Sequence, residues 1–199
     1  MRSGCHALEL GIEAGSERAL RILGKRFAPR DALRAHDRLV AAGIQPVYNF
    51  VFGWPGETAA DQSATRRLIE RLHGTAPKVR FNFRLYQAIP GTTMGDAAFP
   101  QGRRLPRNLD ELRVYRAAPG AEMPWLSPRE VRRVRFLVDY VLPLAYDDAL
   151  HDRCRTDRRR SLLARLARWR SQTGFLAWSV DRQMFERLGG AALPSTYLP

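Results

Sequence analysis

Two segments of this chain repeat one pattern: an apolar run, a turn that contains glycine, and a polar residue suited to begin a helix. They are residues 9–18 (ELGIEAGSER) and residues 49–58 (NFVFGWPGET). Apolar runs joined by connections of helix length predict buried parallel strands. Parallel strands end at the same edge of a sheet, and α/β proteins build their small-molecule sites at that edge.

The first half of the chain continues this alternation of strands and helices. We expect three strands, near residues 7–12, 47–53 and 79–88. The expected helices begin at residues suited to a cap or to the first helical position: Ser16, Pro29 and Thr58. Because helices connect the strands, we predict that the strands pair in parallel and in sequence order, with right-handed crossovers.

The second half of the chain has a different composition. Residues 90–126 are rich in proline and glycine, which indicates a long irregular connection. Residues 127–130 (SPRE) then have the cap, proline and glutamate of a helix start. Residues 151–170 carry eight arginines in a predicted helix. We therefore divide the chain into an α/β part, residues 1–100, and an irregular linker with a basic helical extension, residues 101–199.

Composition limits the class of protein. With 45% hydrophobic and 27% charged residues, a chain of 199 residues can bury a core and is not disordered by composition. No stretch of about 18 apolar residues is present, so we expect no transmembrane helix. The N-terminal residues lack the apolar core of a signal peptide, and the cytoplasm is the expected compartment.

The formal net charge of +13 raises the expectation of an anionic partner, including nucleic acid. The alternative is that arginine, which makes up most of the basic residues, replaces lysine on ordinary solvated faces. We favour this alternative, because net charge bears on solubility and non-specific binding rather than on fold.

Three short motifs give the chain a resemblance to a known family. Residues 11–16 (GIEAGS) resemble the sequence Gly-Ile-Glu-Ser-Gly-Ser at the fourth barrel strand of radical S-adenosylmethionine (radical SAM) enzymes. Residues 52–57 (FGWPGE) resemble the Gly-Leu-Pro-Gly-Glu sequence after the fifth strand, and residues 89–92 (IPGT) resemble the Pro-Gly-Thr sequence after the sixth. The chain is similar to the branch that includes methylthiotransferases and cobalamin-binding members.

The resemblance implies an α/β fold: the second half of a partial (β/α) TIM-like barrel, with about three parallel strands, and a C-terminal α-helical extension. In the family, a 4Fe-4S cluster at the barrel mouth binds SAM and cleaves it to a 5′-deoxyadenosyl radical. SAM and the 4Fe-4S cluster are therefore the cofactors implied for the complete family protein. The resemblance to cobalamin-binding members also admits cobalamin.

The cysteine content departs from the family pattern. Family members hold the cluster with a Cys-x3-Cys-x2-Cys loop, whereas this chain has only Cys5 and Cys154. We therefore expect a fragment that lacks the first three strands, binds no cluster and cleaves no SAM alone, and we assign no catalytic and no metal-binding residue. The expected partner is the missing N-terminal half or a complementing chain. Without it, Leu8, Leu10 and Ile12 of the first strand should be exposed.

The resemblance places three candidate cofactor-binding residues at or after the first turn. Glu13 matches the family glutamate near the SAM ribose, whose hydroxyls need an acceptor; alternatively, it accepts from local backbone amides. Ser16 matches the serine beside that glutamate, although it also suffices as a helix cap. Lys25 falls where the family often has a basic residue that faces the SAM carboxylate, but Arg26 is equally suited and both also fit a surface.

The second turn provides the remaining candidate cofactor-binding residues. Gly53, Pro55 and Gly56 let the backbone approach adenine closely, or simply form a tight turn. Glu57 orients the loop through backbone hydrogen bonds, or only favours the helix N-terminus. Trp54 is bulkier than the usual leucine and either stacks on adenine or fills the core.

The leading hypothesis is a fragment of a radical SAM enzyme that contributes the SAM ribose- and adenine-binding half of the barrel and is inactive alone. The alternative is a basic α/β binding module that contacts RNA or another acidic partner without catalysis. A steep salt dependence of binding would favour this second class. The sequence identifies neither the substrate nor the reaction, leaves open whether the chain is itself an enzyme, and gives no reason to expect a membrane partner.

Overall fold

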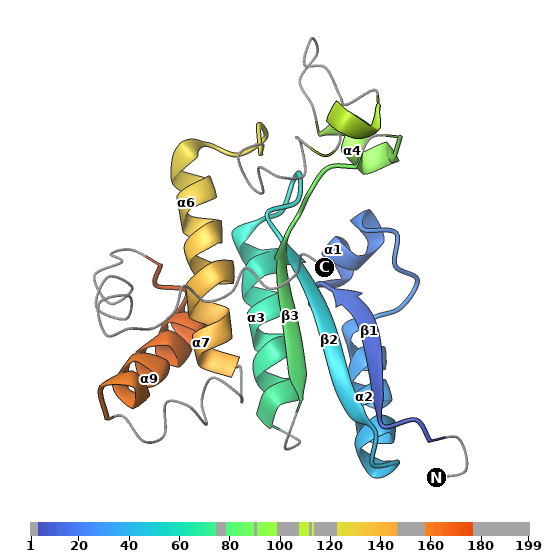
Figure 1. The fold of residues 1–199 in the computed structure, drawn as a ribbon, viewed down its shortest axis with the longest axis vertical. Helices are drawn as coiled ribbons and strands as arrows, with labels where there is room; N and C mark the ends of the chain where they lie inside the picture. Colours follow the sequence, from blue (N-terminus) through green and yellow to red (C-terminus); the bar gives the residue numbers. More distant parts are fainter. Residues whose placement is uncertain are drawn as a thin grey trace.

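The computed structural model describes residues 4–74, 79–89, 91–98, 108–111, 113, 123–146 and 158–176 (Figure 1). The N-terminal elements are β1 (Ala7–Glu13), α1 (Glu17–Ile22), α2 (Pro29–Ala41), β2 (Gln45–Phe52), α3 (Ala59–Gly74), β3 (Arg80–Leu85) and α4 (Thr93–Ala97). The later elements are α6 (Pro128–Phe136), the π-helical turn η1 (Leu137–Val141), α7 (Leu142–Tyr146) and α9 (Arg158–Thr173). Strands and helices thus alternate through the first half.

The three strands form one parallel sheet in the order β1-β2-β3. This confirms the predicted pairing, which follows from the helical connections between the strands. In the register of the sheet, Gly11 lies opposite Asn49, and Asn49 lies opposite Asn82. The strand bounds are close to prediction, although β3 ends at Leu85 rather than near residue 88.

One face of the sheet packs against helices α2 and α3, which lie behind it in Figure 1. Buried and half-buried residues alternate along β2, and its fully buried side chains are Tyr48, Phe50 and Phe52. Helix α3 contributes the three residues that its periodicity predicts, Leu68, Ile69 and Leu72. Full burial of one such side chain contributes roughly 1.5–3 kcal/mol, so this face supplies much of the stability.

A buried polar pair lies within the same layer. His36 of α2 is 1% exposed, and its Nδ1 lies 3.0 Å from the hydroxyl oxygen of Tyr48. Burial lowers the pKa of His36, against the smaller opposing effect of Asp37. This histidine therefore has a structural role in the packing of α2 against β2.

The C-terminal helices join the core of the sheet. Helix α6 begins at the predicted capping box, in which the Glu130 carboxylate accepts from the Ser127 amide at 2.8 Å. Fully buried leucines of η1 and α7 pack in the cluster that contains the sheet residues: Leu137, Leu142 and Leu144. In Figure 1 these helices lie on the α3 side of the sheet, with α7 against α9. Within the described residues, no helix combines the length and the apolar character needed to cross a bilayer.

Two arginines of this region are buried rather than solvated. Arg66 of α3 donates to the carbonyl oxygen of Ser171 in α9. The guanidinium of Arg170 lies over the Phe136 ring, 5.4 Å from its centroid, and donates to the carbonyl oxygen of Phe175 at 2.9 Å. Part of the positive charge of the chain therefore holds α3, α6 and α9 together.

Within the described residues, β1 forms one edge of the sheet. Leu8 is 43% exposed and Leu10 is half-buried, but Ile12 is only 3% exposed. The expectation that all three side chains are exposed is therefore wrong for Ile12, because this residue packs into the main core at the carboxyl end of the strand. The remaining exposed part of β1 is its first half.

An open strand edge with apolar residues is a template for association. We expect the 199-residue chain to self-associate, and Leu8→Lys to make it monomeric, because a charged side chain on an edge strand opposes pairing. Ile22→Lys is the matched control, since Ile22 has the same 43% exposure but lies on α1. Size-exclusion chromatography with light scattering is the measurement. A monomeric parent chain, or equal effects of both variants, would contradict this expectation.

Candidate functional site

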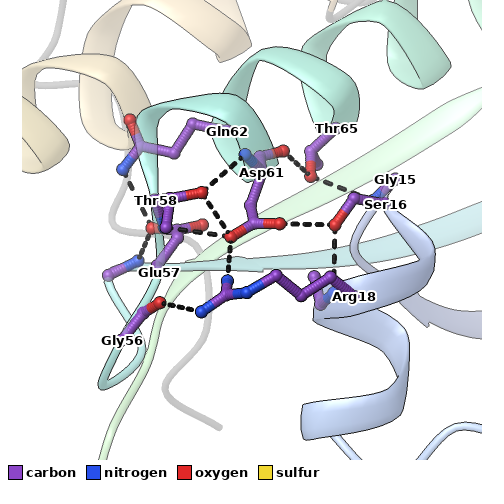
Figure 2. A network of polar contacts seen from close by, with 11 residues as sticks. Gly15, Ser16, Arg18, Gly56, Glu57, Thr58, Asp61, Gln62 and Thr65 are labelled. Carbon is purple, nitrogen blue, oxygen red and sulfur yellow. Dashed lines mark hydrogen bonds and ion pairs between the residues drawn. The ribbon is translucent and has the colours of Figure 1, made fainter.

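The turn after β1 and the turn after β2 meet at one buried carboxylate (Figure 2). Asp61, in the first turn of α3, is 3% exposed. It accepts from the Ser16 hydroxyl at 2.6 Å, the Thr58 hydroxyl at 2.6 Å and the Thr58 amide at 3.0 Å. Ser16 belongs to the first turn and Thr58 to the second, so Asp61 holds the two turns together.

Arg18 strengthens the same junction. Its guanidinium pairs with Asp61 and donates to the carbonyl oxygen of Gly56 at 3.1 Å. On the other side of the network, the Gly15 amide donates to the Thr65 hydroxyl at 2.9 Å. A Cβ at Gly15 would lie 2.6 Å from a backbone atom of α3, so only glycine allows this approach. These contacts confirm that both turns lie at the carboxyl end of the sheet.

The electrostatics of Asp61 follow from its partners. Burial alone would raise its pKa, but the hydrogen bonds from Ser16 and Thr58, with the charge of Arg18, lower the pKa below its usual value. In the sequence, Asp61 is recognisable only as the acidic residue three positions after the helix-start residue Thr58. The sequence did not reveal that this carboxylate is buried, or that its partners are a serine and an arginine 43–45 residues away.

Glu13 has the only positive φ of any non-glycine residue in the described part of the chain, at 70°. Such a backbone conformation is strained for a side chain of this size and often accompanies a functional site. The Glu13 carboxylate lies 3.2 Å from the ammonium of Lys25, which also donates to the Gly11 carbonyl oxygen at 3.0 Å. A Cβ at Gly11 would lie 2.6 Å from the Glu13 carboxylate, so glycine makes room for it.

The pairing of Glu13 with Lys25 brings two sequence-predicted site residues together. Both side chains are partly accessible, at 22% and 29%. Lys25 is one of two lysines in the chain, the other being Lys78. A lysine in an arginine-rich chain offers a compact ammonium rather than a planar guanidinium. The pair forms a small charged site beside the end of β1.

The second turn is organised around Glu57. Gly53 and Gly56 have φ values of 76° and 80°, which favour glycine. The Glu57 carboxylate accepts from the Gly53 amide at 2.7 Å and from the Gln62 side chain at 2.9 Å. Glu57 therefore orients the loop through a backbone hydrogen bond, as one of its two interpretations predicted. Burial raises its pKa to about 7, although the hydrogen bonds from Gln62 and Gly53 partly offset this effect.

The other predicted site residues differ in accessibility. Trp54 is 0% exposed and packs in a small cluster with Leu20, so of its two interpretations the structure favours the core. The hydroxyl of Ser16 caps α1 and also donates to Asp61, so the same group has both roles. Pro55 is half-buried and Gly56 is exposed. The accessible candidates are therefore Glu13, Lys25, Pro55 and Gly56.

The third motif also forms a turn after a strand. Thr92 caps α4, and its hydroxyl accepts from the Gly95 amide at 3.0 Å. A Cβ at Gly95 would lie 2.0 Å from the Ile89 carbonyl oxygen, so this turn also depends on glycine. All three family-like motifs thus form turns between a strand and a helix.

The described residues do not supply a cluster site. They contain no group of three or more His, Cys, Asp or Glu side chains placed to hold a metal ion. Cys5 is half-buried, and Cys154 lies outside the described residues. An iron–sulfur cluster requires several thiolates, so the donor set of this sequence does not fit that group.

Comparison with known proteins gives partial matches. No protein-family model matches the chain. It is 39% identical over 88 residues to tRNA-2-methylthio-N(6)-dimethylallyladenosine synthase of Cereibacter sphaeroides, covering 43% of this chain and 19% of that protein. The chain is also 43% identical over 65 residues to the same enzyme of Acidithiobacillus ferrooxidans, covering 32% of this chain and 14% of that protein. An uncharacterized methyltransferase of Pyrococcus horikoshii is 28% identical to the chain over 105 residues, covering 53% of this chain and 22% of that protein.

These matches agree with the motifs and the strand order. The tRNA methylthiotransferases are a radical SAM family, so the matches support a relationship between this chain and the radical SAM superfamily. The chain spans about one fifth of the length of the curated relatives that it matches. The open parallel sheet is compatible with part of a β/α barrel.

Replacing Asp61 should separate the two turns. We expect Asp61→Asn to lower the free energy of unfolding at pH 7 by about 3 kcal/mol, because a buried charged acceptor with several donors is lost. The folded-state pKa of Asp61 lies below its ordinary 3.8, so this stabilisation is present above that pH and is lost as the pH falls through the folded-state pKa. The difference between the parent chain and the variant should therefore shrink in acid.

Urea denaturation across this pH range is the measurement for Asp61. Asp31→Asn is the control, since Asp31 accepts the α2 cap hydrogen bond from the Ala28 amide at 2.8 Å and an exposed contact from Arg34 at 3.5 Å, and should contribute about 1 kcal/mol. Equal losses for the two variants would show that Asp61 does not join the turns.

Glu57 should give the opposite pH dependence. Its pKa rises from 4.5 to about 7 on folding, so stability should fall as the pH rises between these values. We expect Glu57→Gln to remove this decline, which amounts to at most about 3 kcal/mol. Denaturation at pH 5 and pH 8 measures it, with the exposed Glu17→Gln as control. A parent chain equally stable at both pH values would contradict the assignment.

Proposed function

We propose that residues 7–98 form the SAM ribose- and adenine-binding part of a radical SAM barrel. The observation that carries this proposal is the strained, partly accessible Glu13, held beside Lys25 at the end of a strand that carries the family-like motif. A carboxylate in this position suits two vicinal hydroxyls, because an ionised carboxylate only accepts hydrogen bonds.

The chain's own residues have distinct roles in this proposal. Lys25 orients the Glu13 carboxylate through its ion pair, donates to the Gly11 carbonyl oxygen, and leaves one N–H donor for an anionic group of the ligand. The second turn presents Pro55 and Gly56 at the same end of the sheet, and Gly56 is exposed. Because Arg18 joins Gly56 to the Asp61 network, the distance between the two turns is fixed before a ligand binds.

The reductive chemistry of the family requires a cluster that this sequence does not ligate. We propose that the cluster-binding loop and the other barrel strands come from polypeptide beyond these 199 residues, which would also cover the open edge of β1. In the complete protein, the cluster and SAM together supply the radical. This chain contributes binding, orientation and exclusion of water.

A titration of the 199-residue chain with SAM, followed by amide signals in nuclear magnetic resonance spectra, tests the proposal. We expect shifts at Glu13, Lys25 and Gly56, and a loss of affinity of about tenfold in Glu13→Gln, since one charged hydrogen bond is removed. Glu17→Gln, an exposed acidic position of α1, is the matched control. Absence of shifts in the two turns, or equal affinity in both variants, would overturn the assignment.

A further inference from the structure

The face of the sheet opposite α2 and α3 carries a row of polar side chains, one from each strand. Glu9 comes from β1, Asn49 from β2 and Asn82 from β3. Asn49 and Asn82 are register partners. On β1, Gly11 lies opposite Asn49, and Glu9 lies two residues before Gly11, opposite Val47. Residues on this face alternate along the strands with the buried aromatic residues of the other face, so the row and the aromatic core lie on opposite sides of the sheet.

Hydrogen bonds join the three side chains. The Asn49 amide donates to a Glu9 carboxylate oxygen at 2.8 Å, and the Asn82 amide donates to the same oxygen at 3.4 Å. Asn82 also donates to the amide oxygen of Asn49 at 2.8 Å. Because an ionised carboxylate only accepts, Glu9 fixes which way both amides point. The row therefore has a defined polarity, with its negative charge at the β1 end.

This arrangement is unusual for a sheet face that is meant to be covered by another layer. Asparagine is disfavoured in strands, and a face that packs against helices is apolar, as the Tyr48 and Phe50 side of this sheet is. On the polar side Asn82 is only 8% exposed, whereas Glu9 is exposed. A hydrogen-bonded row with one accessible charged end is suited to line a ligand chamber rather than a packed interface.

The row is continuous with the charged site at the strand ends. Gly11 shares the level of Asn49 and Asn82, and the Glu13 carboxylate occupies the space where a Gly11 side chain would lie. A polar path therefore runs from Lys25 and Glu13 down to Glu9. Arg80 shares the level of Glu9 but lies two strands away, roughly 10 Å by strand spacing.

We propose that Glu9, Asn49 and Asn82 bind the substrate through a cationic or neutral group with several N–H donors, such as an amidine, an amine or an amide. The second Glu9 oxygen has no partner among the described residues, which leaves a charged acceptor on the accessible end of the row. An anionic group would meet the Glu9 charge. The location as a substrate site rests on the proposed function, whereas the chemistry of the row does not.

Benzamidinium is a suitable probe, because it presents several N–H donors on a planar cation; benzoate has the same ring and the opposite charge. In the ¹⁵N-labelled 199-residue chain, we expect benzamidinium to shift the side-chain amide signals of Asn49 and Asn82, and benzoate to leave them unchanged. Glu9→Gln should weaken benzamidinium binding about tenfold or more, while the exposed control Glu17→Gln should not.

A second variant separates binding from stability. Asn49→Leu should abolish the benzamidinium shifts at Asn82 and leave the chain folded, because leucine suits a half-buried strand position and Asn82 keeps Glu9 as an acceptor. Unchanged shifts in Glu9→Gln, equal shifts with benzoate, or a large loss of stability in Asn49→Leu would overturn the inference and leave the row a structural feature.

The SAM titration distinguishes this inference from the proposed function. If benzamidinium shifts the NMR signals of Asn49 and Asn82 but SAM does not shift those of the Glu13 and Gly56 turns, the row keeps its proposed binding chemistry and the barrel assignment is rejected. Shifts of the turns by SAM, with no response of the row to benzamidinium, would reject the row alone.

Discussion

The arrangement of the candidate site depends on one buried carboxylate. Asp61 accepts hydrogen bonds from Ser16 and Thr58 and pairs with Arg18, so residues from two separate turns share one acceptor. A buried charge is strongly unfavourable unless its hydrogen-bonding capacity is filled, and here donors from both turns fill it. Each turn follows a strand of the same sheet, so parallel pairing brings the two turns to the same edge. The contacts of Asp61 then fix the distance between the two halves of the site.

The two faces of the sheet have different roles: one provides hydrophobic stability and the other carries the polar side chains. The side with Tyr48, Phe50 and Phe52 is fully buried against helices and the C-terminal extension, and it supplies the hydrophobic stabilisation. The opposite side carries Glu9, Asn49 and Asn82, which contribute polarity at the expense of β propensity. The strained residue Glu13 lies at the end of the same sheet, where the ion pair with Lys25 holds its side chain.

The large positive charge has more than one structural use. Arg18 bridges the two motif turns, and Arg66 and Arg170 hold the C-terminal helices against each other and against α3. These contacts place guanidinium groups on carbonyl oxygens, carboxylates and aromatic rings within the molecule. The net charge of this chain therefore does not measure the strength of an anion-binding surface.

The sequence by itself determined the features that depend on neighbours within a few residues: the three strands, the caps at Ser16, Thr58 and Ser127, and the glycine turns. It also predicted the parallel order of the strands, because helix-length connections between strands leave that pairing as the expected one. Periodicity and capping report such local preferences. Tertiary structure alone decided that Trp54 fills the core, that Ile12 is buried, that Glu13 faces Lys25 and that Asp61 joins the turns. These features depend on contacts that span 12 to 45 residues or on packing across elements, and side-chain pattern along one element does not specify which distant group it will meet.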